Sequence, residues 1–177
     1  MRVIAGSLKG RRLKAPTWDG LRPTSDKLRE TLFNILAPRI EGARVLDGFA
    51  GTGAVGIEAL SRGASHVTFV ERDPRAVALI EANLALCGIG ADYNVHRGDV
   101  LAALRHRGAT FDVILLDPPY DLHPVSPTLE AAAACLSAGG LLVLERATRR
   151  EPDIPPTLTR VRDVKSGDST LTFVERM

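Results

Sequence analysis

Short apolar segments alternate with helical patterns from residue 43 to residue 147, and this alternation restricts the fold more than any other feature of the chain. The segments expected to form strands are 43–49, 66–72, 93–98, 111–117 and 140–147, and those expected to form helices are 53–62, 74–87, 99–106 and 126–137. Strands that are separated by helices pair in parallel, with helices over both faces of the sheet. The sequence therefore predicts an α/β fold built on a mostly parallel sheet.

Different elements flank this pattern. Residues 157–165 and 169–177 are strand-like and are separated by Ser-Gly-Asp, which predicts a C-terminal antiparallel hairpin. Before the sheet, residues 2–16 predict a Gly-turned hairpin, and residues 25–36 predict a helix that Thr24 or Ser25 caps.

The domain expectation follows from length and from these flanks. A chain of 177 residues with 45% hydrophobic content fits one domain with a substantial core. We expect a single Rossmann-like domain over residues 1–177, with a basic hairpin and helix at 1–37, a core at 43–177 and a seven-stranded sheet. The prolines of 151–156 indicate that the last crossover helix is shortened or missing.

The cysteine, histidine and apolar content of the chain bears on metal binding and on cellular location. Cys87 and Cys135 fall in helical segments without metal-ligand spacing, and the four histidines are scattered, so no metal is expected. The chain begins without an apolar signal region and has no membrane-length apolar run. We therefore expect a cytoplasmic protein with reduced thiols and no membrane partner.

Basic residues are concentrated near the start of the chain. Residues 1–29 hold eight Lys and Arg against two Asp, which makes an arm of charge +6 on a body of charge −4. A solvated terminus is one interpretation, and contact with a polyanion is the favoured one. The candidate contacts in the first half of this arm are Lys9, Arg11, Arg12 and Lys14.

A glycine-rich loop follows the first core strand. Gly51 and Gly53 leave the backbone open to a ligand, and the helix that begins there presents unpaired N–H groups. A tight strand-to-helix turn without a ligand is the alternative interpretation. Asp47, placed inside the strand end, argues against that alternative.

Acidic residues also end the next two strands. Glu71 follows the glycines by about twenty residues, the spacing at which a carboxylate accepts hydrogen bonds from ribose hydroxyls. Asp99 could accept from an adenine amino group or cap the following helix, and both roles stay open. Three acidic groups at successive strand ends favour a nucleoside ligand.

The order of these residues resembles the Rossmann-like S-adenosylmethionine-dependent methyltransferases. Their loop motif corresponds to Asp47, Phe49, Gly51 and Gly53, their ribose acid to Glu71 and their adenine-side acid to Asp99. The fourth strand ends in Asp117-Pro118-Pro119-Tyr120, which resembles the motif of enzymes that methylate exocyclic amines of nucleobases. The resemblance implies S-adenosyl-L-methionine as cofactor and these four residues as the catalytic motif.

The chemistry of amine methylation explains this motif. An exocyclic amine conjugates its lone pair into the ring, so its two hydrogens must be held before the lone pair can meet a methyl group. The Asp117 carboxylate and the Pro118 carbonyl are candidate acceptors, and the prolines fix the backbone that aims that carbonyl. Tyr120 offers a stacking face, worth roughly 1 to 3 kcal/mol per base.

Further segments resemble one narrower family within these methyltransferases. "RVIAGSLKGRRL", "LRPTSDKLRETLFNIL" and "DPPY" resemble the RsmD-type ribosomal RNA methyltransferases. This implies methylation of N2 of a guanine in 16S rRNA, as in the guanine(966)-N2 enzymes, on a small ribosomal subunit or an assembly intermediate, by a monomer. It also implies that Thr24 contacts the cofactor and that Arg22 and Arg29 contact RNA at the entrance. Helix capping and a surface ion pair are the alternative roles of these three residues.

One departure from this family and two competing functions remain. Related N-terminal hairpins often carry a tryptophan near residue 8, where this chain has Leu8, and Trp18 is a possible substitute. A DNA adenine-N6 or cytosine-N4 methyltransferase would share the motif at 117–120, although 177 residues leave little room for a target-recognition region. A non-catalytic nucleotide-binding assembly factor would leave Pro118 and Tyr120 without a role.

Overall fold

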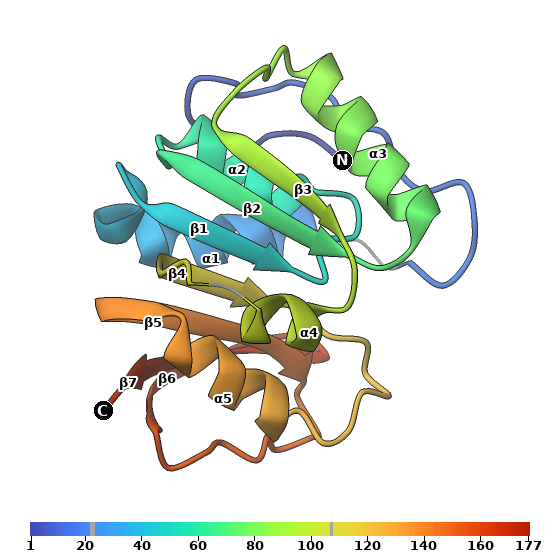
Figure 1. Cartoon of the computed structure of the whole chain (residues 1–177). Coiled ribbons are helices and arrows are strands. Elements are labelled where there is room, and N and C mark those ends of the chain that lie inside the picture. Colours follow the sequence, from blue (N-terminus) through green and yellow to red (C-terminus); the bar gives the residue numbers. More distant parts are fainter. Residues whose placement is uncertain (22–23, 107) are drawn as a thin grey trace.

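A seven-stranded sheet forms the centre of the computed structural model, which describes residues 1–21, 24–106 and 108–177 (Figure 1). The strands are β1 (Arg44–Gly48), β2 (His66–Glu71), β3 (Tyr93–Arg97), β4 (Phe111–Leu116), β5 (Leu136–Ala147), β6 (Leu158–Ser166) and β7 (Ser169–Arg176). Their order is β3-β2-β1-β4-β5-β7-β6. β1 to β5 run parallel, and β7 is antiparallel to β5 and β6. The predicted Rossmann-like fold with a C-terminal antiparallel hairpin is confirmed.

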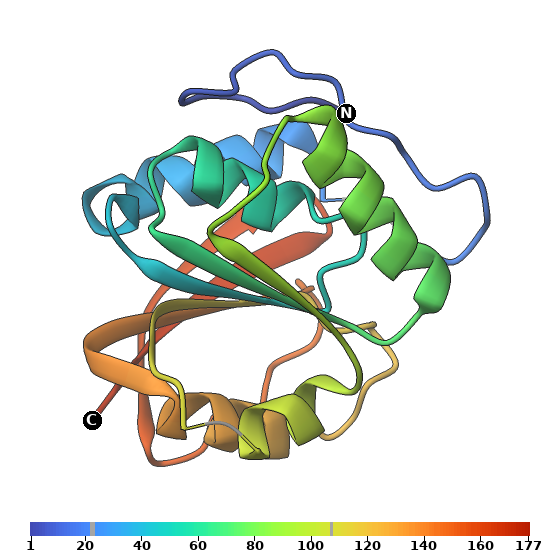
Figure 2. The same ribbon diagram turned by 45° about the horizontal axis from the view of Figure 1, so that its top comes forward.

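Helices cover both faces of the sheet (Figure 2). They are α1 (Asp26–Ile40), α2 (Ala54–Ser61), α3 (Pro74–Leu86), α4 (Val100–Arg105) and α5 (Ser126–Ala134). Side chains of α1, α2 and α3 share one buried apolar cluster with one face of the sheet, and those of α4 and α5 share a second cluster with the other. The near-continuous burial of β1, β2 and β4 follows from this two-sided cover.

The strand order determines where a ligand crevice is expected in this sheet. The chain proceeds outward from β1 through β2 to β3 and then returns to the other side of β1 as β4. At such a reversal the loops after the two central strands diverge, and the crevice at their carboxyl ends is the usual ligand position in open α/β sheets. The residues that follow β1 and β4 are the glycine-rich loop and the motif at 117–120.

Helix α1 is longer than predicted. The Ser25 hydroxyl accepts a hydrogen bond from Leu28 N, which confirms one of the two expected caps. The helix continues through Pro38 to Ile40, whereas the expected end was residue 36. A proline removes one backbone donor, yet burial of Leu36 and Ile40 against the sheet keeps the last turn helical.

The boundary between α5 and β5 also differs from the prediction. The helix was expected to reach residue 137 and the strand to begin at 140, but α5 ends at Ala134 and β5 begins at Leu136. Leu136 pairs with Phe111, and the ladder then shifts register before Val113. Gly139, expected at a helix end, lies inside β5 with φ of 74°, a conformation that glycine tolerates.

The connection between β5 and β6 agrees with the prediction from the sequence. Residues 148–157 contain no helix, which confirms that the last crossover helix is missing. The N-terminal hairpin is reduced to one antiparallel bridge between Arg2 and Arg12, with Val3 N donating to Arg11 O.

No helix in the described parts of the chain is long and apolar enough to cross a membrane.

Candidate active site

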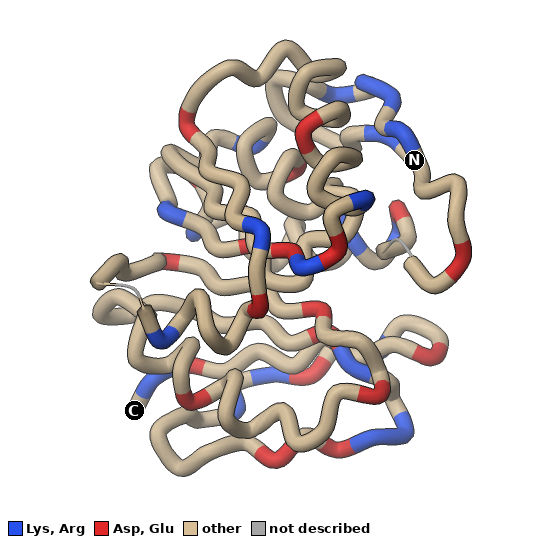
Figure 3. Tube along the Cα trace, turned by 45° about the vertical axis from the view of Figure 1, so that its right-hand side comes forward, with Lys and Arg blue, Asp and Glu red and all other residues tan. Residues whose placement is uncertain are grey.

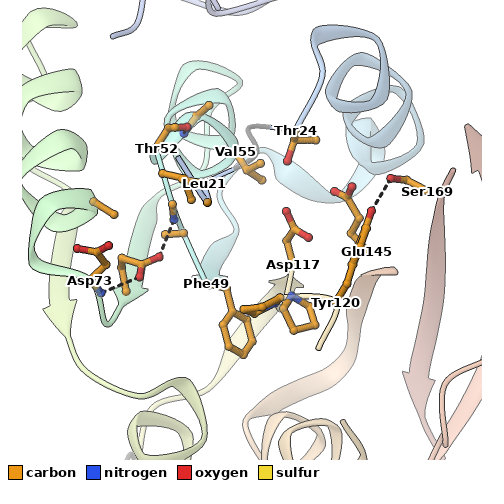
Figure 4. Close-up of a pocket in the computed structure, with 18 of the residues that line it drawn as sticks. Leu21, Thr24, Phe49, Thr52, Val55, Asp73, Asp117, Tyr120, Glu145 and Ser169 are labelled. Carbon is orange, nitrogen blue, oxygen red and sulfur yellow. Dashed lines mark hydrogen bonds between the residues drawn. The ribbon is translucent and has the colours of Figure 1, made fainter. Parts of the chain in front are cut away.

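A cavity of about 890 Å³ opens at the carboxyl ends of β1, β4 and β5, on the side of α1 (Figure 4). Its walls come from the segment before α1, the glycine-rich loop, the end of β2, the motif at 117–120 and the β6–β7 turn. The predicted site residues that line it are Thr24, Asp47, Phe49, Gly51, Glu71, Asp117, Pro118, Pro119 and Tyr120. The fold therefore brings together segments that are far apart in the sequence.

The glycine-rich loop is shaped by positive φ angles and close packing. Gly51 has φ of 55° and Gly53 has φ of 75°, so both positions favour glycine. A Cβ at Gly53 would lie 3.2 Å from Ile80 side-chain atoms. Gly53 itself is not among the cavity residues, so its part is to form the turn that starts α2.

Asp47 ties the end of β1 to the first turn of α2. Its Oδ2 accepts a hydrogen bond of 2.8 Å from Gly56 N, and only 4% of the residue is exposed. Burial away from water raises the pKa of Asp47 to about 8, the Gly56 N–H opposes this rise, and the charge of Glu71 adds to it. Burial therefore favours the protonated form of this carboxyl.

Glu71 is held by three backbone donors. Its Oε2 accepts from Gly51 N at 2.9 Å, and its Oε1 accepts from Arg72 N at 2.8 Å and Asp73 N at 2.9 Å. A carboxylate offers about four acceptor positions, so about one remains for a ligand. The sequence suggested that this carboxylate could serve both ribose hydroxyls, and the observed bonds leave room for about one.

Asp99 caps α4 through a bond of 2.9 Å from Ala102 N to its Oδ1. The same residue lines a smaller cavity of about 140 Å³, next to the main one, together with Phe49 and Glu71. The two roles left open by the sequence are thus compatible: the cap is present, and the adenine contact stays a prediction.

The motif at 117–120 leaves β4 at the centre of the sheet. Asp117 is half-buried, and its N–H donates to Gly48 O at 3.4 Å. Pro118 is buried, whereas Tyr120 is 40% exposed. The Tyr120 hydroxyl shares a hydrogen bond of 3.1 Å with Ser169 Oγ. The backbone carbonyl of Tyr120 accepts a hydrogen bond from the Arg150 guanidinium. An accessible ring and a half-buried carboxyl thus meet at one edge of the cavity.

The structure adds residues that the sequence reasoning missed. Glu145, at the carboxyl end of β5, and Ser169, at the start of β7, both line the cavity. In Figure 4 the Glu145 side chain lies beside Asp117 and Thr24. An acidic residue ending an apolar strand was the signal used for Asp47 and Glu71, and it also applies to Glu145.

The basic candidates separate into two groups. Lys9, Arg11, Arg12 and Lys14 are exposed, and Figure 3 shows Lys and Arg gathered along this N-terminal segment. Arg29 is fully buried, so its predicted RNA contact is wrong. It forms ion pairs with the exposed Asp26 at 3.0 Å and with the buried Glu58 at 3.8 Å. Arg22 lies outside the described residues.

Two further expectations concern Trp18 and metals. The Trp18 ring lies under the Arg75 guanidinium, 5.0 Å from it, and both residues line the cavity. This tryptophan therefore packs over the wall of the cavity formed by the start of α3. Among the described residues, His, Cys, Asp and Glu form no group of three or more that could hold a metal ion.

Known proteins are similar to this chain in sequence and in fold. The family model described as "Conserved hypothetical protein 95" matches residues 1–175. YlbH of Bacillus subtilis, named as a candidate rRNA methyltransferase, is 42% identical over 163 residues, which are 89% of this chain and 88% of that protein. The ribosomal RNA small subunit methyltransferase D of Escherichia coli is 42% identical over 120 residues, 68% of this chain and 60% of that protein.

A solved structure agrees with these relatives. The candidate methyltransferase yhhF from Escherichia coli superposes with a TM-score of 0.88 at 34% identity, covering 99% of this chain and 97% of that one. These matches confirm the resemblance seen in the sequence motifs. The chain belongs to the family described as Conserved hypothetical protein 95, the family of the RsmD-type methyltransferases.

Proposed function

We propose that this protein transfers a methyl group from S-adenosyl-L-methionine to the exocyclic N2 amine of a guanine in small-subunit (16S) ribosomal RNA. The observation that carries this proposal is the placement of the motif at 117–120 in the same cavity as the glycine-rich loop and Glu71. An amine-orienting motif and a nucleoside-binding edge are thus adjacent. The names of the relatives support ribosomal RNA as the substrate.

The residues around the β1 and β2 ends hold the cofactor in this proposal. Gly51 and the start of α2 face its carboxylate end, Glu71 accepts from a ribose hydroxyl, and Phe49 and Asp99 border the adenine. Thr24 and Asp47 line the same cavity, and Asp47 is oriented by Gly56 N. The bound cofactor supplies a methyl group already activated by its sulfonium.

The protein contributes mainly orientation of the amine. The Asp117 carboxylate and the Pro118 carbonyl accept the two amine hydrogens, so that the nitrogen lone pair turns out of the ring plane toward the methyl group. Tyr120 stacks on the base, and its bond to Ser169 fixes the ring. Such positioning can lower a barrier by about 7 to 11 kcal/mol. The proton lost by the product nitrogen passes to Asp117 or to water.

The target guanine must be unpaired. The N2 amine of a paired guanine is engaged in pairing at the minor-groove edge, and a cavity lined by Asp117 and Tyr120 can receive it only from a loop or a flipped nucleotide. We propose that Lys9, Arg11, Arg12 and Lys14 contact the phosphates of that RNA. The protein acts as a cytoplasmic monomer on a small subunit or an assembly intermediate in this proposal.

Single-turnover methylation with labelled cofactor tests the proposal. Small-subunit RNA, small subunits and duplex DNA are offered separately, and the product nucleoside is identified by mass spectrometry. We expect N2-methylguanine from an RNA substrate. Production of N6-methyladenine, or transfer to duplex DNA alone, would show that the substrate assignment is wrong.

Variants of the motif test the mechanism. Asp117→Ala should abolish most turnover while cofactor binding persists, and Asp153→Ala, an exposed aspartate between β5 and β6, serves as the control. Tyr120→Ala should reduce turnover through lost stacking, roughly 1 to 3 kcal/mol. Tyr120→Phe keeps the ring and should retain much of the activity. Wild-type turnover by Asp117→Ala would contradict the mechanism.

A further inference from the structure

Two carboxylate side chains lie next to each other across the β4–β5 ladder. Leu116 of β4 is paired in register with Leu144 of β5, and these strands run parallel. The next residues, Asp117 and Glu145, therefore occupy neighbouring positions on the same face of the sheet, on strands about 5 Å apart. Figure 4 shows both side chains in the cavity, with Thr24 above them.

This arrangement restricts which base edge can dock there. An ionised carboxylate only accepts hydrogen bonds, so two of them side by side favour a base edge that presents two adjacent donors. The Watson–Crick edge of guanine has such a pair, the N1–H and the N2 amine. Adenine and cytosine place an unprotonated ring nitrogen beside their exocyclic amine, and its lone pair would face a carboxylate.

We infer that Glu145 is the residue that selects guanine, by accepting the N1–H hydrogen bond while Asp117 and the Pro118 carbonyl hold the N2 amine. This inference rests on the proposed function and assigns a residue to its base specificity. It also gives a physical reason against the adenine-N6 and cytosine-N4 alternatives. A site built on a hydrogen bond discriminates strongly, because the wrong base leaves a buried polar group without its partner.

The position of Glu145 fits this role. The residue is half-buried and lines the cavity, whereas the preceding side chains of β5, Val143 and Leu144, are buried in the two apolar clusters. Its neighbour on the other side, β7, begins at Ser169, which holds the Tyr120 hydroxyl. One end of the base thus meets Glu145, and its face meets the tyrosine ring.

The test compares two bases in otherwise identical RNA. The small-subunit RNA is ligated with either guanine or 2-aminopurine at the modified position, which is mapped beforehand by mass spectrometry. 2-Aminopurine keeps the amine but has an unprotonated N1 and lacks O6. Single-turnover rates are measured for the wild type, Glu145→Gln and Glu145→Asp, with Glu130→Gln on the exposed side of α5 as a matched control.

The expected readout is the ratio of the two rates. Glu145→Gln should slow guanine methylation by about 10- to 100-fold, the loss of a charged hydrogen bond. A glutamine amide can donate to the bare N1, so 2-aminopurine methylation should fall less or rise. Any loss of O6 contacts affects both enzymes equally and cancels in the comparison. Glu145→Asp keeps an acceptor and should keep the guanine preference at a lower rate.

The outcomes separate this inference from the proposed function. If the wild type forms N2-methylguanine but Glu145→Gln and Glu145→Asp slow both bases by the same factor, Glu145 has only a structural role and the inference is overturned. If the wild type forms no N2-methylguanine, the proposed function itself fails. Cofactor affinity and thermal unfolding of each variant, measured beside Glu130→Gln, show whether the fold is intact.

Discussion

A buried carboxyl at the end of β1 makes the stability of the protein depend on pH. The folded state raises the pKa of Asp47 to about 8 because the group is removed from water. A group with a raised pKa binds its proton more tightly when folded, so the contribution of Asp47 to stability is fully present below its unfolded pKa of about 4 and is lost as pH rises through about 8. The slope can reach about 1.4 kcal/mol per pH unit.

Replacement of this carboxyl should flatten the slope. Asp47→Asn keeps an oxygen that accepts from Gly56 N but cannot ionise, so the free energy of unfolding should lose most of its decline between pH 5 and pH 8. Denaturant unfolding at four pH values in this window measures the effect. The matched control is Asp153→Asn, whose exposed side chain should leave the slope unchanged. A wild-type slope in Asp47→Asn would mean that Asp47 is ionised in the folded protein.

Glu71 holds the loop and, in the proposed function, also binds the cofactor, so its variants should separate the two roles. Glu71→Ala removes the acceptor of three backbone N–H groups, so it should destabilise the loop as well as weaken cofactor binding. Glu71→Gln keeps one acceptor oxygen. We expect it to retain more of the fold and to lose about 1.5 to 3 kcal/mol of cofactor affinity, the range for charged hydrogen bonds. Calorimetry gives the affinity, and thermal unfolding gives the stability. Unchanged affinity in both variants would remove Glu71 from the site.

At the scale of the elements, the basic arm is a fixed surface and not a loose terminus. Ile4 N and Ala5 N donate to the buried Glu58 of α2 at 2.8 and 3.0 Å. Lys14 N donates to Asn83 Oδ1 of α3 at 2.7 Å. The backbone that carries the exposed charges between these anchors is therefore held against α2 and α3.

This fixed arm leads to a prediction about salt. Replacing Arg11, Arg12 and Lys14 by alanine should weaken RNA binding broadly, and each lost phosphate contact should remove roughly 0.7 to 0.9 from the slope of log affinity against log salt. Cofactor affinity should stay nearly unchanged. Filter binding at several salt concentrations measures the slope, with Arg176→Ala, an exposed residue at the end of β7 away from Ser169 and the cavity, as the control. A slope equal to that of the wild type would mean that the arm does not contact phosphates.

The accuracy of the sequence predictions depended on how local each determinant is. Core strands and the helices between them follow from apolar periodicity, which is local. The early start of β5 at Leu136 depends on pairing with Phe111, and the burial of Arg29 depends on Glu58; both are tertiary contacts. The role inferred for Glu145 depends on the register of β4 against β5, which no pattern in either strand specifies.

At the scale of the whole molecule, the arm and the sheet core are joined through buried polar groups. Glu58 is fully buried, accepts hydrogen bonds from the arm and from Arg62 at 2.8 Å, and forms an ion pair of 3.8 Å with Arg29 of α1. Removing one member of such a network leaves the others buried without partners, which costs more than the net gain of the bond. We propose on this basis that residues 1–177 unfold as one cooperative unit.

A substitution in the arm tests this proposal. Gly6 has φ of 80°, and a Cβ there would lie 1.8 Å from the backbone oxygen of Ser61 in α2. Gly6→Ala should therefore force the arm off α2 and destabilise the protein by roughly 1 to 3 kcal/mol. Gly10→Ala has a similar φ of 84° but open space around its Cβ, so it isolates the cost of the backbone conformation alone.

The single tryptophan allows unfolding of the arm to be compared with unfolding of the helices in one denaturant titration. Trp18 lies within the arm and contacts Arg75 of α3, so its fluorescence reports the packing of the arm, while circular dichroism reports the helices. If the chain is one unit, both signals should change at the same denaturant concentration in the wild type, and both midpoints should fall together in Gly6→Ala. A tryptophan transition that precedes the loss of helix would show that the arm unfolds separately. Its basic residues would then be presented to RNA by a detachable segment rather than by a rigid surface.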